Sequence, residues 1–163
     1  MRKLQRTDIP HLQGLLKGLC KSGRFTTQEV DCALELLHLV LDQPEQRDYI
    51  ATVIESKAGP VGFIIYGSVP LTAGTFDIYW IATALAVHGS GYGQLLLEHA
   101  ERDMRRRGAR LVCLETSSQE NYERTRSFYD KAGYQQAAVI KDFYRPGDDR
   151  ITYVKQLVAL QES

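Results

Sequence analysis

The feature that most constrains this chain is a run of three glycines at alternate positions, Gly89, Gly91 and Gly93, between a strand-like and a helix-like segment. Residues 75–83 (TFDIYWIAT) are rich in aromatic and branched side chains, as strands are. Apolar residues then recur at helical spacing up to Met104. Unpaired N–H groups in a first helical turn attract anions, and glycine lets a diphosphate approach them closely. The pattern therefore predicts an anion site over residues 89–94, with a simple flexible loop as the alternative.

Two other phosphate-binding motifs compete with this interpretation. A P-loop is excluded, because no Gly-Lys-Ser/Thr sequence occurs in the chain. A dinucleotide fold needs GxGxxG and an acidic residue about 20 positions further on, and Glu115 lies at roughly that distance. However, the glycines are spaced GxGxG and follow several strands. The chain after Glu115 is also too short for the further strand–helix units that a doubly wound sheet requires.

The order of expected elements indicates the fold class. Two helices, starting near residues 8–10 and 26–27, precede three strands, and a helix follows the glycines. A buried-type strand, another helix and two further strands complete the chain. After the glycines, Leu96, Leu97, Ala100 and Met104 indicate a helix that Gly108 can end. The other expected segments after the second helix cover residues 49–57, 61–68, 75–83, 109–117, 121–132, 134–140 and 150–157. This order predicts a single α+β domain over residues 1–163, with a mixed, mostly antiparallel central sheet and helices on both faces.

Composition narrows the class of protein. Lys plus Arg and Asp plus Glu each total 20, so the net charge is zero, which argues against a nucleic-acid partner. The three cysteines show no metal-ligand spacing and indicate reduced thiols in a cytoplasmic protein. The four histidines are too scattered for a metal site. No run is apolar enough to enter a membrane, and no secretory signal is visible.

Three segments together resemble the GNAT superfamily, acyltransferases that use acetyl-CoA. These segments are YWIAT at residues 79–83, HGSGYGQLLL at 88–97 and RSFYDKAGY at 126–134. The resemblance implies the GNAT acyl-CoA N-acyltransferase fold, with acetyl-CoA as cosubstrate and no metal. His88 departs from the usual Gln or Arg of the family's phosphate loop, which affects that side chain's own contact and leaves the backbone donors unchanged.

The resemblance also implies which residues contact acetyl-CoA. Pantetheine would bond the backbone of Ile81, Ala82 and Thr83, and Asn121 would touch the cofactor before the last helix. The diphosphate would lie on the glycine loop, which consists of His88, Gly89, Ser90, Gly91, Tyr92, Gly93 and Gln94.

Three side chains are candidates for the chemistry. The family implies that Tyr129 is the proton donor, because a phenol with a pKa of about 10 is protonated at neutral pH. Its alternative role is to pack its helix on the sheet. Asp77, on the strand before the glycines, and Glu115, at the end of a buried strand, are candidate bases. A salt-bridge or capping role is at least as common for such carboxylates, and no dedicated base is required.

These observations predict an N-acetyltransferase that moves acetyl directly from acetyl-CoA to a primary amine, on a small molecule or a protein. A non-catalytic acyl-CoA sensor on the same fold and a nucleotide-dependent oxidoreductase are the alternatives. Acyl chains longer than acetyl also fit the sequence. Dimers are common in the family, and the wide apolar stripe on residues 30–41 permits one, although such stripes more often belong to the core.

Overall fold

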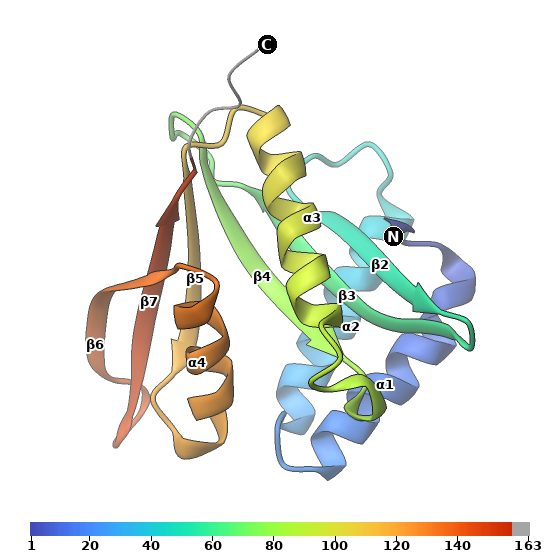
Figure 1. Ribbon diagram of the computed structural model, residues 1–163, viewed down its shortest axis with the longest axis horizontal. Helices are drawn as coiled ribbons and strands as arrows, with labels where there is room; N and C mark the ends of the chain where they lie inside the picture. Colours follow the sequence, from blue (N-terminus) through green and yellow to red (C-terminus); the bar gives the residue numbers. More distant parts are fainter. Residues whose placement is uncertain (158–163) are drawn as a thin grey trace. The chain divides into compact units, whose positions relative to one another are not determined.

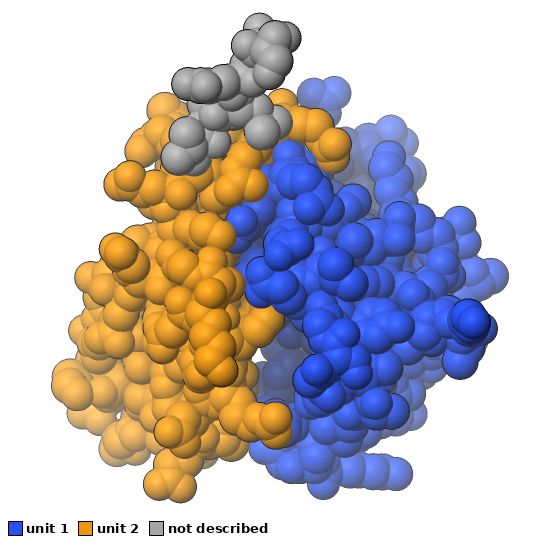
Figure 2. Space-filling model, in the orientation of Figure 1, with its two compact units in different colours: residues 1–68, 78–103 blue, residues 69–77, 104–163 orange. Residues whose placement is uncertain are grey.

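The structure is a computed structural model that describes residues 1–157, and its contacts group these residues into two compact units. Unit 1 comprises residues 1–68 and 78–103, and unit 2 comprises residues 69–77 and the chain from Met104 onward. Figure 2 shows unit 1 in blue and unit 2 in orange. Neither unit is a contiguous stretch of sequence, and the single domain expected over residues 1–163 stays a prediction.

The strands pair in the order β1-β2-β3-β4-β5-β7-β6, in which only the β4–β5 pair is recorded as parallel (Figure 1). Their bounds are Arg2–Lys3, Ile50–Ser56, Gly59–Ser68, Thr75–Thr83, Leu111–Ser117, Gln135–Arg145 and Asp148–Gln156 for β1 to β7. The α-helices are Ile9–Lys21, Thr27–Asp42, Tyr92–Arg106 and Glu123–Lys131 for α1 to α4. Short 3₁₀ turns cover Arg6–Asp8, Leu85–Val87 and Glu120–Tyr122. The predicted α+β class and mostly antiparallel sheet are confirmed.

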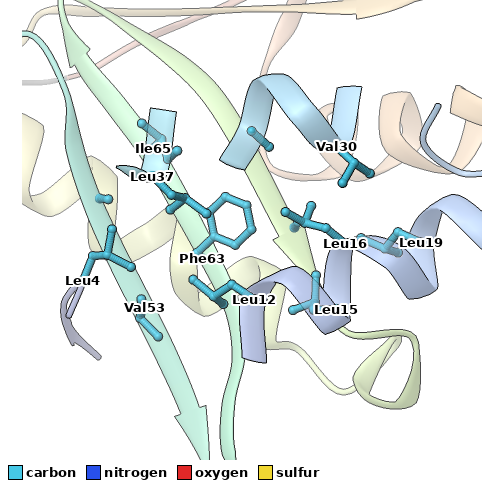
Figure 3. Packing of buried hydrophobic residues seen from close by; sticks show 13 residues of the cluster. Leu4, Leu12, Leu15, Leu16, Leu19, Val30, Leu37, Val53, Phe63 and Ile65 are labelled. Carbon is cyan, nitrogen blue, oxygen red and sulfur yellow. The ribbon is translucent and has the colours of Figure 1, made fainter. Parts of the chain in front are cut away.

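The core of unit 1 lies between the two N-terminal helices and the sheet. In Figure 3 the side chains of Leu12, Leu16 and Leu37 gather around the ring of Phe63 on β3. Residues alternate between the two faces of a strand, and Tyr66, on the other face of β3, donates a hydrogen bond to Asp103 of α3 at 2.7 Å. Both faces of β3 are therefore covered, which explains its continuous apolar sequence.

Helix α2 shows why the apolar stripe on residues 30–41 is so wide. The helix begins after Thr26, whose side chain accepts from the Glu29 N–H while the Glu29 carboxylate accepts from the Thr26 N–H. The stripe then packs into the core of its own unit through Val30 and Leu37, together with the less buried Leu34, Leu36, Val40 and Leu41. Most of the apolar stripe therefore packs against the core of unit 1.

Unit 2 places α4 against β5 and β7, with β6 at the end of the sheet order (Figure 1). All eleven residues of β6 are exposed, and Asp142 within it has a left-handed φ of 52°. The strand continues to Arg145, beyond the predicted end at residue 140, because Arg145 pairs with Asp148 across a tight turn at Gly147. Among residues 1–157, no helix combines the length and apolar character needed to cross a membrane.

Candidate functional site

The glycine loop has a backbone conformation that explains two of its three glycines. Gly89 and Gly91 have φ values of 79° and 85°, in the left-handed region that other residues adopt at a cost. A Cβ added at either position would meet no atom within 4 Å, so the requirement is conformational rather than steric. Gly93 lies in the first turn of α3 and has no positive φ.

The loop leaves a cluster of backbone donors without partners. Ser90 donates its N–H to the Val87 carbonyl at 3.1 Å, and Leu95 donates to Gly91 at 3.0 Å as the first bond of α3. The five remaining amides form no hydrogen bond of normal geometry within residues 1–157, and they belong to Gly89, Gly91, Tyr92, Gly93 and Gln94. The first turn of α3 carries no acidic side chain. Loop and helix end therefore present N–H groups and a positive dipole end to an anion.

The His88 ring contacts the chain itself. Its Nε2 donates to the Thr83 carbonyl at 3.0 Å, and its backbone N–H donates to Leu85 at 3.2 Å. The side chain that departs from the family pattern thus connects the loop to the end of β4. This contact supports the loop without using any of its free amides.

The end of β4 has one edge that is not fully paired. Ala84 donates to Val61 of β3 at 2.8 Å, and a Cβ added at Gly62 of β3 would lie 2.9 Å from the Ala82 carbonyl oxygen. Because backbone groups alternate in direction along a strand, those of Ile81 and Thr83 point to the other edge. The parallel ladder with β5 covers only Thr75 to Asp77, so it does not extend to these two residues. The backbone of Ile81 and the Thr83 N–H are available there, while the Thr83 carbonyl is occupied by His88.

Asp77 and Glu115, the two predicted base candidates, lie close together in unit 2. Asp77 pairs in register with Cys113, and Glu115 follows two residues later on the same face of β5. Burial, and secondarily the charge of Glu115, raise the pKa of Asp77. Burial and the same two carboxylates raise the pKa of the Cys113 thiol. Asp77 and Cys113 are thus partly desolvated, whereas Glu115 is half exposed.

Arg150 of β7 completes this cluster and was missed by the sequence analysis. Its Nη1 lies 3.2 Å from Oε1 of Glu115, and its guanidinium carbon lies 4.4 Å from the centre of the Phe143 ring. The contact depends on the β5–β7 register, which pairs Arg150 with Ser117. No local motif in the sequence indicates that register.

Tyr129 lies on the other face of the same sheet. Its side chain is 5% exposed and its ring packs against those of Phe128, Tyr134 and Tyr153. Tyr153 pairs with Leu114, so Tyr129 lies on the Leu114 face, and Cys113 and Glu115 point to the opposite one. Burial raises the pKa of Tyr129, so its phenol stays protonated, and the hydroxyl makes no hydrogen bond within residues 1–157.

Asn121 lies in the short turn Glu120–Tyr122 that leads into α4, and it is exposed. Within residues 1–157, no three His, Cys, Asp or Glu side chains are arranged to hold a metal ion.

Comparison with known proteins places this geometry in a family context. Residues 47–136, just over half of the 163-residue chain, match the model of the acetyltransferase (GNAT) domain. A solved structure from Desulfovibrio desulfuricans, assigned to the GNAT family of acetyltransferases, is 35% identical, with a TM-score of 0.88 and coverage of 97% of this chain and 98% of that one. None of the curated proteins compared with the chain matches it in sequence.

Two more distant structures share the fold. An aminoglycoside 6'-N-acetyltransferase complexed with coenzyme A is 17% identical, with a TM-score of 0.74 and coverage of 98% of both chains. The ribosomal-protein-S18-alanine N-acetyltransferase from Escherichia coli is also 17% identical, with a TM-score of 0.70 and coverage of 99% of this chain and 95% of that one.

Proposed function

The chain belongs to the GNAT family of acetyltransferases, and from this premise we propose that it transfers acetyl from acetyl-CoA directly to a primary amine. The observation that carries the proposal is the set of five amides between Gly89 and Gln94 that have no hydrogen-bond partner within residues 1–157, shortly after the end of β4. These donors suit the two negative phosphates of coenzyme A. A related fold is known in complex with coenzyme A, which supports this assignment.

The backbone at the end of β4 suits the rest of that molecule. The backbone groups of Ile81 and the Thr83 N–H point to the edge where the β4–β5 ladder has ended, and the amides of pantetheine would bond there as an added strand. The bound thioester supplies an activated acetyl carbon. Asn121 is proposed as a further contact to the cosubstrate.

Tyr129 is proposed as the general acid. Its buried phenol holds its proton throughout the neutral range, and the absence of a hydrogen-bond partner within residues 1–157 leaves the hydroxyl available to a ligand. The proton passes from the phenolic oxygen to the leaving sulfur as the carbon–sulfur bond breaks, and Tyr129 regains a proton from solvent before the next turnover.

The acceptor amine must lose a proton before it attacks, because an aliphatic ammonium has no free electron pair. Asp77 and Glu115 are proposed for this step. Since they face away from Tyr129 on the unit 2 sheet, the acid and the base act as separate groups that do not exchange a proton directly. The acceptor class is a small molecule or a protein that carries a primary amine.

Calorimetric titration with acetyl-CoA is the first test, and no binding at millimolar cosubstrate would refute the proposal. Release of the coenzyme A thiol is then followed over a panel of primary amines. Binding without release across the panel would favour an acyl-CoA sensor over an enzyme. A change in NADH fluorescence on mixing would favour an oxidoreductase.

Tyr129→Phe tests the acid separately. The variant keeps the buried ring and loses only the hydroxyl, so kcat should fall about 10²–10⁴-fold while acetyl-CoA affinity is retained. Phe128→Leu, at the neighbouring position, is the matched control for loss of aromatic packing on the helix. An equal loss of affinity and kcat in Tyr129→Phe would assign the residue a structural role.

A further inference from the structure

We propose that Tyr49 and Tyr79 form an aromatic subsite for the acceptor, and that the acceptor is a primary amine joined through a short linker to an aromatic ring. The inference rests on the proposed function and deepens it, because that function leaves the acceptor open to any primary amine. The residues that carry it all belong to unit 1.

The subsite consists of two tyrosine rings that meet edge to face. Tyr79 lies on β4, two residues before Ile81, and its ring centre is 5.0 Å from that of Tyr49 at an interplanar angle of 66°. This arrangement is attractive, because the edge of one ring is positive and the face of the other is negative. Tyr79 nevertheless stays 37% exposed. The pair therefore presents aromatic surface to solvent beside the end of β4.

Tyr49 is held over the sheet by the segment between α2 and β2. Its N–H donates to Oε1 of Gln46 at 2.9 Å, and Nε2 of Gln46 donates to the Tyr49 carbonyl at 2.8 Å. The segment crosses β3 at Gly67, where an added Cβ would overlap the Asp48 carbonyl. Gly67 shares a face of β3 with Phe63 of the unit 1 core, since side chains alternate along a strand. The missing side chain at Gly67 thus lets Tyr49 reach across β3 to the ring on β4.

The cosubstrate brings its reacting end toward this pair. In the proposed function the diphosphate lies on residues 89–94, after the end of β4, and pantetheine bonds the Thr83 N–H and the backbone of Ile81. Pantetheine therefore runs back along β4, and the thioester lies beyond Ile81 in the direction of Tyr79. Two strand residues span about 7 Å, so the Tyr79 ring is within reach of a small acceptor whose amine is at the thioester.

The chemistry of the transfer determines which part of the acceptor meets the rings. The attacking amine is neutral and lies at the acetyl carbon, so the rings contact the rest of the molecule. Tyrosine rings offer a flat apolar surface with a hydroxyl at its rim, and a third ring gains edge-to-face or offset-stacked contacts there. An alkyl chain gains only the burial of apolar area. The pair therefore favours an arylalkylamine over an alkylamine of similar length.

The test compares acetyl transfer to 2-phenylethylamine, hexylamine and 1,5-diaminopentane, which have similar lengths. In the wild type, kcat/KM should be about 2–10-fold higher for 2-phenylethylamine than for hexylamine. Tyr79→Leu removes the ring and keeps an apolar side chain, so the two amines should become equivalent, whereas Tyr79→Phe should keep the preference. Tyr49→Leu is a second variant that should also lower it. The Kd of acetyl-CoA, measured by calorimetry, should stay unchanged in all three variants.

Tyr144→Leu is the matched control. Tyr144 is 48% exposed and meets Phe143 edge to face, with 5.0 Å between the ring centres, on β6 in unit 2. This variant should keep the wild-type preference. A purely structural role of Tyr79 would lower kcat/KM for all three amines alike and leave their ratios unchanged, which would contradict the subsite.

Three further results would overturn the proposal. One is equal kcat/KM for 2-phenylethylamine and hexylamine in the wild type. Another is a preference that survives in both Tyr79→Leu and Tyr49→Leu. The third is a preference for 1,5-diaminopentane over the other two amines, which would assign the rings to a second ammonium group.

A binding measurement separates this inference from the proposed function. Acetyl-CoA binding without thiol release for any amine would refute the proposed function. Calorimetric titration of the coenzyme A-saturated protein with 2-phenylethylamine then tests the subsite by itself. A Kd about 2–10-fold weaker in Tyr79→Leu than in the wild type supports the subsite. An unchanged Kd, or no binding to the wild type, overturns it.

Discussion

Alanine substitution of Gly89 or Gly91 isolates the backbone conformation of the loop. Both residues have left-handed φ values, 79° and 85°, in which a Cβ costs about 1–2 kcal/mol. A Cβ at either position meets no atom within 4 Å, so no clash adds to this cost and no new packing offsets it. Each variant should therefore carry a penalty of about 1–2 kcal/mol that arises from the main chain alone.

This penalty must be measurable in one of two ways. If the loop keeps its conformation, the free energy of unfolding falls by about 1–2 kcal/mol. If the loop relaxes to a negative φ, its amides turn, and acetyl-CoA binds about 5–30-fold more weakly because the competent conformation is rarely populated. The sum of the two losses, rather than either alone, is what the structure predicts.

Urea denaturation at pH 7 and calorimetric titration with acetyl-CoA measure the two losses. Gly14→Ala is the matched control, because Gly14 is exposed within α1 and an added Cβ also meets nothing within 4 Å. That variant should gain about 0.5–1 kcal/mol from helix propensity and leave binding unchanged. A Gly89→Ala protein with wild-type stability and wild-type affinity would contradict the assigned loop conformation.

Three further predictions concern stability. Hydrogen bonds from Arg2 lower the pKa of the buried Asp8 below its usual 3.8, so its contribution is present above that pH and is lost as pH falls through the folded-state pKa. Asp8→Asn should lower the free energy of unfolding by about 2–4 kcal/mol at pH 7, less than the loss of a fully buried ion pair because Arg2 is partly exposed. Urea denaturation at several pH values should show that the stability of the variant depends less on pH in the acidic range than that of the wild type. Asp77→Asn should instead be more stable than wild type at pH 7, because burial raises the pKa of Asp77 and its ionised form therefore destabilises the fold. This gain in stability should disappear below pH 3.8, where the carboxyl is protonated in both the folded and the unfolded chain. A variant that is less stable than wild type at pH 7 would contradict this. Phe63→Ala should lower the free energy of unfolding by about 3–5 kcal/mol, measured in urea, since the ring is fully buried in the unit 1 core, and a loss below 1 kcal/mol would place it outside that core.

Local sequence predicts the elements whose signals are local. The strand at residues 75–83 is found with the predicted bounds, because its aromatic and branched residues end at the glycine-rich loop. The start of α2, expected at residues 26–27, is found there, with Thr26 as the capping residue. The end of β6 was predicted too early, since its continuation depends on pairing with β7 and on the left-handed Asp142, neither of which a local pattern contains.

For the candidate site, too, the sequence predicts the individual residues but not how they are brought together. The glycine loop and the individual candidates Asp77, Glu115 and Tyr129 follow from sequence pattern and family resemblance. Their relation to one another does not. Asp77 meets Glu115 only through the β4–β5 register, and the place of Tyr129 depends on the β5–β7 register and on the face of the sheet on which α4 packs. Arg150 was missed because its contact depends on the β5–β7 register. The His88 contact to Thr83 was missed because it depends on how the loop after β4 folds back on the strand end.

The exposed edge strand β6 has a consequence for how copies of the chain behave in concentrated solution. An edge strand with apolar residues offers a template on which a foreign strand can grow. Within residues 1–157, β6 ends the sheet order, and Val139, Ile140, Phe143 and Tyr144 lie along it. Lys141 and the left-handed Asp142 divide these four into two short pairs. The ladder between β6 and β7 is interrupted between Ile140 and Arg145, and an interruption of this kind makes an edge strand a poorer template for a second copy of the chain.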